Sequence, residues 1–280
     1  MADGTEIVDS TKTIETVRTM TLYGRDLRVS VRPGDASRTP LLLCNGIGAS
    51  LDVLQPFVDA LDPALEVIRF DMPGVGGSPR PVVPYHMSTF APVLAELVKQ
   101  LGHEQVDVLG ISWGGGLAQQ FAVQCRRRCR RVVLVATATG SLMVPAKLNV
   151  LSKMATPRRH RDPAYARRIA GEIYGGSART DPGHTTRLLH DGSPKTGRRG
   201  YFYQLAAGLG WSSLPCLGLL RQRTLILAGD DDPIIPEINA RMMHRLIPRA
   251  TLHVYAGGHL ALVSEADQLA PIVDAFLAGD

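Results

Sequence analysis

The chain has 280 residues, of which 45% are hydrophobic and 20% are charged, and its formal net charge at pH 7 is +5. This length and balance allow a large buried core, which excludes a fibrous or intrinsically disordered protein. There is no apolar run of the roughly 18 residues that a membrane-spanning helix needs. The first residues also lack the basic start and apolar stretch of a secretory signal. We therefore expect a globular, cytoplasmic protein without a transmembrane segment.

The four cysteines form no CxxC pair and no spacing typical of a disulfide framework. Two of them, Cys125 and Cys129, are four residues apart and are expected on one face of a helix, which favours structural thiols over a metal site. No histidine and cysteine cluster has the spacing of zinc ligands. We therefore expect a reduced protein that holds no metal.

The first half of the chain alternates β-rich runs with helical patterns, which predicts an α/β fold with a mostly parallel central sheet and helices on both faces. Strands are expected at 14–22, 26–32, 41–46, 66–71, 105–110 and 131–137. Helices are expected at 51–61, 88–101 and 113–125. The alternation resumes near the C-terminus, with a strand at 224–230, a helix at 236–247, a strand at 251–255 and a helix at 264–277.

Residues 141–220 interrupt this alternation with helical fragments, many Arg, Gly and Pro residues, and no buried strand. They hold 12 Lys or Arg against 4 Asp or Glu, so the segment carries +8 and the rest of the chain −3. We predict that 141–220 forms a mainly helical cap, here named the cap segment, over a core made of 1–140 and 221–280. Its basic residues have no nucleic-acid reading motif, so a solvated surface is favoured over a nucleic-acid partner.

The strongest chemical signal is the sequence G-I-S-W-G at 110–114, between a predicted strand and a predicted helix. A serine at such a turn is held in a strained conformation with its hydroxyl exposed above the sheet. Side chains at Gly110 and Gly114 would collide where strand and helix converge. We therefore predict that Ser112 is a nucleophile.

A serine hydroxyl needs a base, because it is a weak nucleophile at neutral pH. His259 follows the last predicted strand, and two glycines before it let its loop fold back towards the serine. The other histidines fall into two groups. His103, His244 and His253 have ordinary structural explanations, and His86, His160, His184 and His190 precede the last strands. We therefore predict that His259 is the base.

The acid that orients this histidine is expected after the preceding strand, where the sequence is AGDDDPIIP. Asp232 lies three residues after Gly229 and four before Pro236, a spacing common at this point in α/β hydrolases. Asp230 and Asp231 are interpreted as caps of the turn or of the next helix. The chain order Ser112, Asp232, His259 is the order of the α/β-hydrolase triad.

The charge that develops on the ester oxygen needs hydrogen-bond donors. We predict that the backbone N–H groups of Trp113 and Ile47 form this oxyanion hole, and that the Asn45 side chain fixes the loop of Ile47. The glycines around Ile47 do not make a dinucleotide site, because Leu51 occupies the third glycine position of that motif. With no phosphate-binding lysine motif either, no cofactor is expected.

Longer motifs carry a more specific resemblance. They are NGIGA at 45–49, FDMPGVGGS at 70–78, GISWGGGLAQQFA at 110–122, LAGDDDPIIP at 227–236, GGHL at 257–260, and, in the cap segment, MVPAK at 143–147, IYGG at 173–176 and LAAGLGWSSL at 205–214. Together they resemble intracellular medium-chain-length polyhydroxyalkanoate depolymerases of the α/β-hydrolase superfamily. The similarity covers nearly the whole chain.

The resemblance implies a substrate class, namely polyesters of 3-hydroxy fatty acids stored as granules, or their oligomers. It also implies an association with such granules in the cytoplasm. The candidate pocket residues are Asn45, Met143, Val144, Trp211 and Leu260. The apolar stretch of the cap segment, which holds Leu142, Met143, Val144, Leu148, Leu151 and Met154, either lines an alkyl pocket or forms the cap's own core.

Other functions fit the same motifs. With the same triad the protein would be a soluble carboxylesterase or lipase-like hydrolase, a carbon–carbon bond hydrolase of dienoic ketoacids, or a cofactor-free perhydrolase. A haloalkane dehalogenase is disfavoured, because its nucleophile is an aspartate. A non-enzymatic alternative is a ligand-binding or granule-associated protein on this fold. Preferred acyl length, exo or endo cleavage and oligomeric state stay open at this stage.

Overall fold

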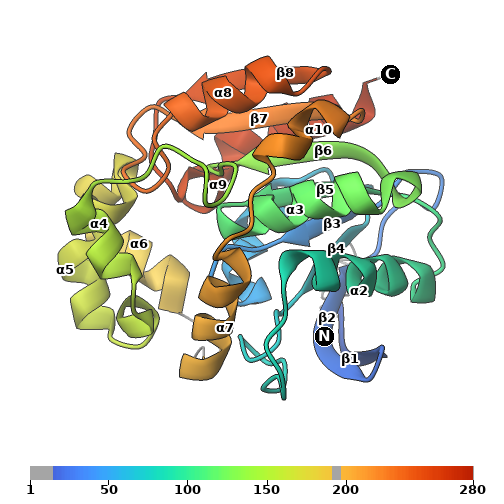
Figure 1. The fold of residues 1–280 in the computed structure, drawn as a ribbon, viewed down its shortest axis with the longest axis horizontal. Coiled ribbons are helices and arrows are strands. Elements are labelled where there is room, and N and C mark those ends of the chain that lie inside the picture. The colour runs from blue at the N-terminus through green and yellow to red at the C-terminus, as the bar shows by residue number, and fades with distance from the viewer. Residues whose placement is uncertain (1–14, 191–196, 280) are drawn as a thin grey trace, which may run out of the picture.

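The computed structural model describes residues 15–190 and 197–279. Its centre is one eight-stranded sheet in the order β1-β2-β4-β3-β5-β6-β7-β8 (Figure 1). The strands are β1 (Thr16–Leu22), β2 (Arg25–Arg32), β3 (Leu41–Cys44), β4 (Val67–Phe70), β5 (Val106–Ile111), β6 (Cys129–Val135), β7 (Arg223–Gly229) and β8 (Ala250–Tyr255). The predicted fold class is confirmed.

β1 and β2 form an antiparallel hairpin, and β2 pairs antiparallel with β4, whereas all other neighbouring strands are parallel. β3, β4 and β5 are buried along their whole length, as expected for mainly apolar strands in a sheet covered on both faces. The carboxyl ends of these parallel strands lie at one edge of the sheet, which is the edge where α/β folds place their ligands.

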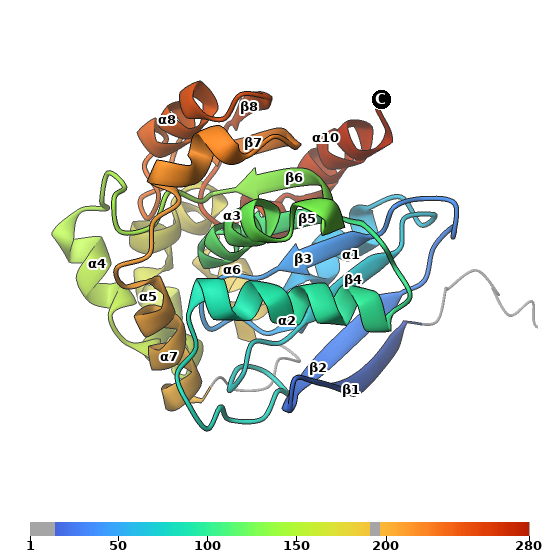
Figure 2. The ribbon, with the colours of Figure 1, turned by 45° about the vertical axis from the view of Figure 1, so that its right-hand side comes forward.

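Helices cover both faces of the sheet. The first core cluster packs α2 (Met87–Gln100), α3 (Trp113–Gln124) and α8 (Ile238–Leu246) against one face. The second packs α1 (Gln55–Ala60), α9 (Ala261–Ser264) and α10 (Ala266–Ala278) against the other. Figure 2 shows α2 and α3 in front of the sheet and α1 and α10 behind it.

The helices of the cap segment lie together on one side of the molecule, at the left in both ribbon views (Figures 1 and 2). Its helices are α4 (Leu148–Met154), α5 (Pro163–Tyr174), α6 (Pro182–His190) and α7 (Arg198–Gly208). The ends of the segment lie side by side, because Ser141 N–H donates to Trp211 O at 2.8 Å and Ser213 N–H donates to Thr139 O at 3.1 Å. The chain therefore leaves the sheet after β6 and returns to β7 at one place.

Two expectations about helices need correction. α3 ends at Gln124, a 3-10 turn covers Arg126–Arg128, and Cys129 opens β6, so the expected helix with Cys125 and Cys129 on one face was wrong. The expected helix at 51–61 begins as a 3-10 turn over Leu51–Leu54. The expected closing helix is present as α10, and the short helix α9 precedes it.

Within the described ranges, no helix is long and apolar enough to cross a membrane. Among the same residues, no three His, Cys, Asp or Glu side chains are grouped so that they would hold a metal ion. The expectation that the chain opens without a secretory signal falls largely on residues 1–14, outside the described part.

Candidate active site

Ser112 occupies a sharp turn between β5 and α3 and has left-handed backbone angles, φ 53° and ψ −121°. A non-glycine residue rarely adopts such a conformation unless its surroundings hold it there. Ser112 N–H donates to Val135 O at 2.9 Å, and the Thr137 hydroxyl donates to Ser112 O at 2.6 Å. β6 and the residues after it therefore fix the strained turn.

The glycines around Ser112 are required by close backbone contacts. A Cβ at Gly110 would lie 2.3 Å from Gly114 O, and one at Gly114 would lie 2.1 Å from Cys44 O. A Cβ at Gly115 would meet the Thr137 hydroxyl at 2.3 Å. These distances are far shorter than a van der Waals contact, so strand, turn and helix converge only because these residues have no side chain.

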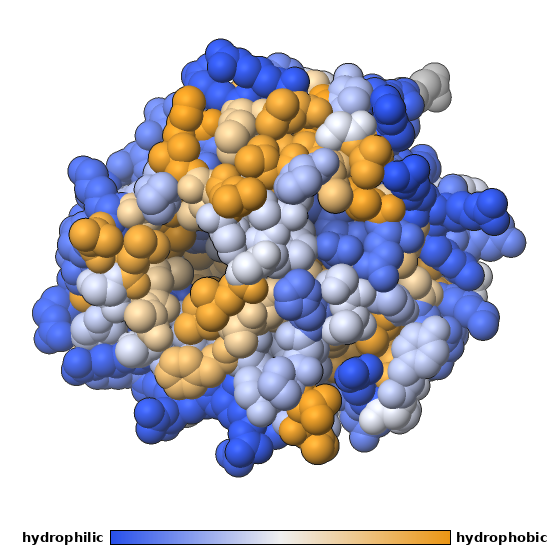
Figure 3. Space-filling model, in the orientation of Figure 1, coloured by the Kyte–Doolittle hydropathy of each residue, from blue (hydrophilic) through white to orange (hydrophobic). Residues whose placement is uncertain are grey.

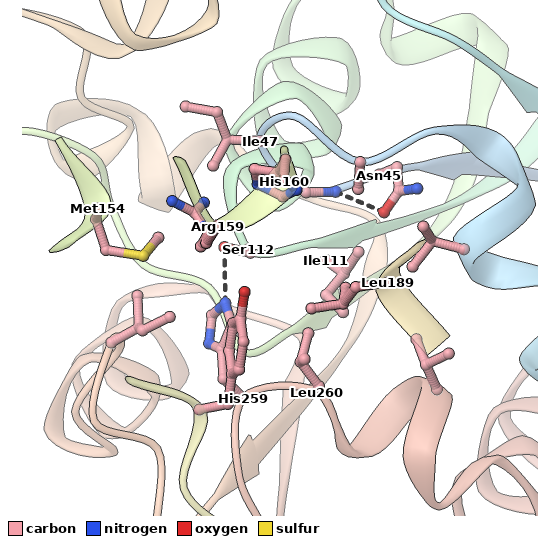
Figure 4. A pocket seen from close by; sticks show the side chains of 16 residues that line it. Asn45, Ile47, Ile111, Ser112, Met154, Arg159, His160, Leu189, His259 and Leu260 are labelled. Carbon is pink, nitrogen blue, oxygen red and sulfur yellow. Dashed lines mark hydrogen bonds between the residues drawn. The ribbon is translucent and has the colours of Figure 1, made fainter. Parts of the chain in front are cut away.

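His259 lies against the serine on one side and an aspartate on the other. Its Nε2 is 2.9 Å from Ser112 Oγ (Figure 4). Its Nδ1 is 2.7 Å from Asp232 Oδ2. Both His259 and Asp232 are buried. The second carboxylate oxygen, Asp232 Oδ1, accepts the N–H groups of Ile234 and Ile235 at 2.9 Å each. The three residues thus form one hydrogen-bonded chain, and the aspartate is held from both sides.

The two neighbouring aspartates have other partners. Asp230 Oδ1 accepts the Gly257 N–H at 3.0 Å, which fixes the turn before His259. Asp231 binds the Arg179 guanidinium through bonds of 2.6 and 2.7 Å and accepts the Gly176 N–H at 2.8 Å. Asp231 therefore links the core to the cap segment instead of capping the next helix.

The loop after β3 lies beside the serine, since a Cβ at Gly46 would be 3.7 Å from Ser112 Cβ. Asn45 stabilises this loop, because its Nδ2 donates to Ser50 O at 2.6 Å and its Oδ1 accepts the Gly46 N–H at 2.7 Å. Within the described chain, the N–H groups of Ile47 and Trp113 have no hydrogen-bond acceptor. Two free donors thus flank the serine.

Two pockets meet at Ser112, which lines both of them. The first is named the Arg159 pocket after one of its lining residues, Arg159. Its lining also includes Asn45, Ile47, His259 and Leu260 (Figure 4). The second, named the Trp211 pocket, includes Met87, Trp113, Gly116, Met143 and Trp211. An ester group at Ser112 would therefore have one pocket for each of its two sides.

The candidate pocket residues are divided between these pockets. Asn45 and Leu260 line the Arg159 pocket, and Met143 and Trp211 line the Trp211 pocket. Val144 lies in neither, since its side chain is exposed and its backbone is held by the side chain of Asn239. Neither interpretation of the apolar cap stretch holds throughout, because Leu142, Leu148 and Leu151 are also exposed.

Sequence reasoning missed the polar residues of the Arg159 pocket. Arg159 and His160 belong to a 3-10 turn, Pro157–His160, and both line the pocket. Burial and the charge of Arg159 hold the pKa of His160 well below its ordinary value. His160 was not considered a candidate for the base because it precedes the last strands. Arg159 was not singled out because no sequence motif distinguishes it from the many other arginines of the cap segment.

Comparisons with known proteins identify the family of the chain. Residues 39–266 match the family model described as alpha/beta hydrolase fold. The chain is also 49% identical to the poly(3-hydroxyalkanoate) depolymerase of Ectopseudomonas oleovorans, over 261 residues that cover 93% of this chain and 92% of the relative. The chain therefore belongs to the α/β-hydrolase family and, within it, to the family of that depolymerase.

Solved structures share the fold at lower sequence identity. A hydrolase from Pseudomonas aeruginosa PA01 superposes with a TM-score of 0.79 and 22% identity, covering 94% of this chain and 98% of that one. The enol-lactonase from Burkholderia xenovorans LB400 gives a TM-score of 0.78 and 20% identity, with coverages of 94% and 100%. These similarities concern the fold alone.

Proposed function

We propose that the protein is a serine ester hydrolase that depolymerises medium-chain-length poly(3-hydroxyalkanoate). The observation that carries the proposal is the hydrogen-bonded chain Ser112–His259–Asp232 in a protein 49% identical to a poly(3-hydroxyalkanoate) depolymerase over nearly its whole length. Binding alone would not need a base aligned with a strained serine, so this arrangement favours an enzyme over a ligand-binding protein.

The proposed cycle has two stages. His259 takes the Ser112 proton while Oγ attacks the ester carbonyl, and Asp232 stabilises the resulting imidazolium. The N–H groups of Ile47 and Trp113 stabilise the oxyanion. His259 then protonates the oxygen of the departing 3-hydroxy chain. A water molecule, deprotonated by the same imidazole, then hydrolyses the acyl-enzyme and releases the acyl chain from Ser112 as a carboxylic acid.

The Trp211 pocket suits an alkyl side chain. Met87, Met143 and Trp211 give this pocket apolar walls. Gly116 of α3, which has no side chain, leaves room in the pocket beside the helix that follows Ser112. Pockets with such walls bind lipid-like groups. We place the side chain of the acyl unit here, beside the Ser112 oxygen that the unit esterifies.

The cap segment would meet the polymer surface. Several of its apolar side chains are exposed, namely Leu142, Val144, Leu148, Leu151 and Leu209. Figure 3 shows hydrophobic residues gathered over α4 and around the hollow beside it. Exposed apolar side chains near a substrate opening are typical of proteins that work at a hydrophobic surface, so granule association is part of the proposal.

The test is hydrolysis of p-nitrophenyl esters from acetate to palmitate beside the clearing of a medium-chain polyhydroxyalkanoate latex, with Ser112→Ala as control. We expect clearing of the latex, an optimum at medium-chain esters and no activity in the variant. Serine-dependent ester cleavage with an untouched latex would reduce the function to a soluble esterase. No turnover in either assay would favour the binding protein.

A further inference from the structure

Arg159 is a buried cation without a counter-ion. Its side chain is 2% exposed, yet no carboxylate of the described residues lies within salt-bridge distance of it. Its hydrogen-bond partners are two phenols: the Tyr201 hydroxyl, 2.8 Å from one terminal nitrogen, and the Tyr174 hydroxyl. Its Nε has no partner within the same residues.

Burying the Arg159 charge without a counter-ion lowers the stability of the fold unless an anion binds to it. An arginine stays charged in proteins, so it cannot escape burial by losing its proton. A buried charge is tolerated when it is paired, and phenol groups only partly replace a carboxylate. The place for a missing partner is open, because Arg159 lines the same pocket as Ser112.

His160 lies beside this place and adds no charge to it. Its ring makes a hydrogen bond with the backbone of Ile47, and a Cβ at Gly48 would be 3.0 Å from the ring. The pKa of His160 is well below the ordinary value because of burial and the neighbouring Arg159 charge, so the ring is neutral. A neutral imidazole has a single N–H, and Ile47 accepts it. The guanidinium of Arg159 is therefore the group left to bind a ligand with two oxygens.

We propose that Arg159 forms a carboxylate subsite that binds the free carboxyl end of the polyester, so that the enzyme removes one 3-hydroxy acid at a time from that end. The inference rests on the proposed function and adds the direction of cleavage. Arginine binds carboxylates through two parallel hydrogen bonds, which gives such a site both affinity and orientation.

The chemistry of the substrate fits this placement. In the last unit the carboxylate carbon is four bonds from the carbonyl carbon that Ser112 attacks, and it lies on the leaving-group side. The bond from Ser112 Oγ to this carbonyl carbon forms and the ester C–O bond breaks. His259 gives its proton to the departing oxygen, and the free 3-hydroxy acid leaves from the Arg159 pocket. The hydroxyl end of the polymer carries no charge that would recognise this subsite.

The test compares two dimers of 3-hydroxyoctanoic acid, one with a free carboxylate and one as its methyl ester. We expect the wild-type kcat/KM to be about 10- to 100-fold higher for the free acid, the range expected for a charge-assisted hydrogen bond. Arg159→Met should remove this ratio. Arg158→Met is the matched control and should keep it, because Arg158 is exposed and pairs with Asp162.

A second measurement needs no variant. Medium-chain polymer esterified at its carboxyl ends is compared with polymer acetylated at its hydroxyl ends, using the wild-type protein. We expect monomer release from the second and at least a tenfold slower release from the first. Equal kcat/KM for the two dimers, or equal release from both polymers, would overturn the subsite and leave the depolymerase standing. If p-nitrophenyl esters are cleaved while both dimers and both polymers stay intact, the subsite and the proposed function both fail.

Discussion

The indole Nε1 of Trp113 donates a 2.8 Å hydrogen bond to the carbonyl oxygen of Gln204 in α7. The side chain of the same Gln204 accepts the Gly48 N–H at 2.7 Å through its Oε1. Gln204 of the cap segment thus binds the side chain of Trp113 and the backbone next to Ile47, the two residues whose N–H groups form the proposed oxyanion hole. The position of those N–H groups depends on how α7 packs against the core.

Gln204→Ala should therefore lower kcat more than it changes KM. The substitution removes the Gln204 oxygen that accepts the Gly48 N–H, which loosens the loop of Ile47 and costs about 1–3 kcal/mol of unfolding free energy. Steady-state kinetics and urea unfolding measure both effects. The exposed Gln124→Ala serves as the control, and an unchanged kcat in Gln204→Ala would show that the loop is held without this contact.

Asp232→Asn should lower kcat by about 10⁴-fold at pH 7, since an asparagine cannot hold the histidine in the required tautomer or stabilise its cation. Asp230→Asn is the matched control on the same loop, because the asparagine oxygen still accepts the Gly257 N–H. The measurement is ester hydrolysis by both variants. A large loss in Asp230→Asn with little in Asp232→Asn would assign the acid to the other residue.

Gly116→Ala should shift the ester preference towards shorter acyl chains. A Cβ at this position would lie 3.0 Å from Trp211 Cζ3 and 3.4 Å from Met87 Cε, so it narrows the Trp211 pocket. The readout is the chain-length profile with p-nitrophenyl esters. Gly218→Ala provides the comparison, because its Cβ would meet nothing within 4 Å. The same shift in both variants would contradict the placement of the alkyl chain.

Arg179→Met should weaken the link between the cap segment and the core. The hydrogen bond to Arg179 is the main reason that the pKa of Asp231 lies below its ordinary value. Because the folded-state pKa is lower than the unfolded value of about 3.9, the pair stabilises the protein above about pH 4. The stabilisation is lost as the pH falls through the folded-state pKa.

Both side chains of this pair are about half exposed, so the loss in unfolding free energy should be at most about 1 kcal/mol and should shrink with added salt. Urea unfolding of both proteins from about pH 3 to 8 tests this. The stability gap between them should be constant above about pH 5 and close below about pH 4. If the difference in unfolding free energy between the two proteins grew as the pH fell, the Arg179–Asp231 ion pair could not be its cause.

Much of this fold could be predicted from the sequence, because the central strands are mainly apolar and the chain alternates strands with helices. Ser112, Asp232 and His259 could be singled out because each follows its own strand and carries a local motif. The boundaries at Cys129 and Leu51 were less predictable. At these positions the hydrophobic periodicity of the sequence does not distinguish a 3-10 turn from an α-helix, and tertiary packing decides which one forms.

Arg159 and His160 could not be singled out in the same way. They belong to a 3-10 turn whose short length gives no hydrophobic period, and their neighbours are other arginines. Their importance arises from contacts with Tyr201 and with the loop of Gly48, which are distant in sequence. The exposed leucines of α4 illustrate the same point, since an apolar stretch alone does not say whether it faces a core, a pocket or solvent.

Gly140, just before the cap segment, is bridged to Ser212 in its last part, so the chain closes on itself between β6 and β7, which are neighbouring strands. Such a closed excursion has an evolutionary consequence. Insertions, deletions or a complete exchange of the chain between these two points leave the register of β6 and β7 unchanged. The hydrolytic machinery that comes from the core can therefore be inherited intact, while selectivity for the two sides of the ester diverges through the inserted part.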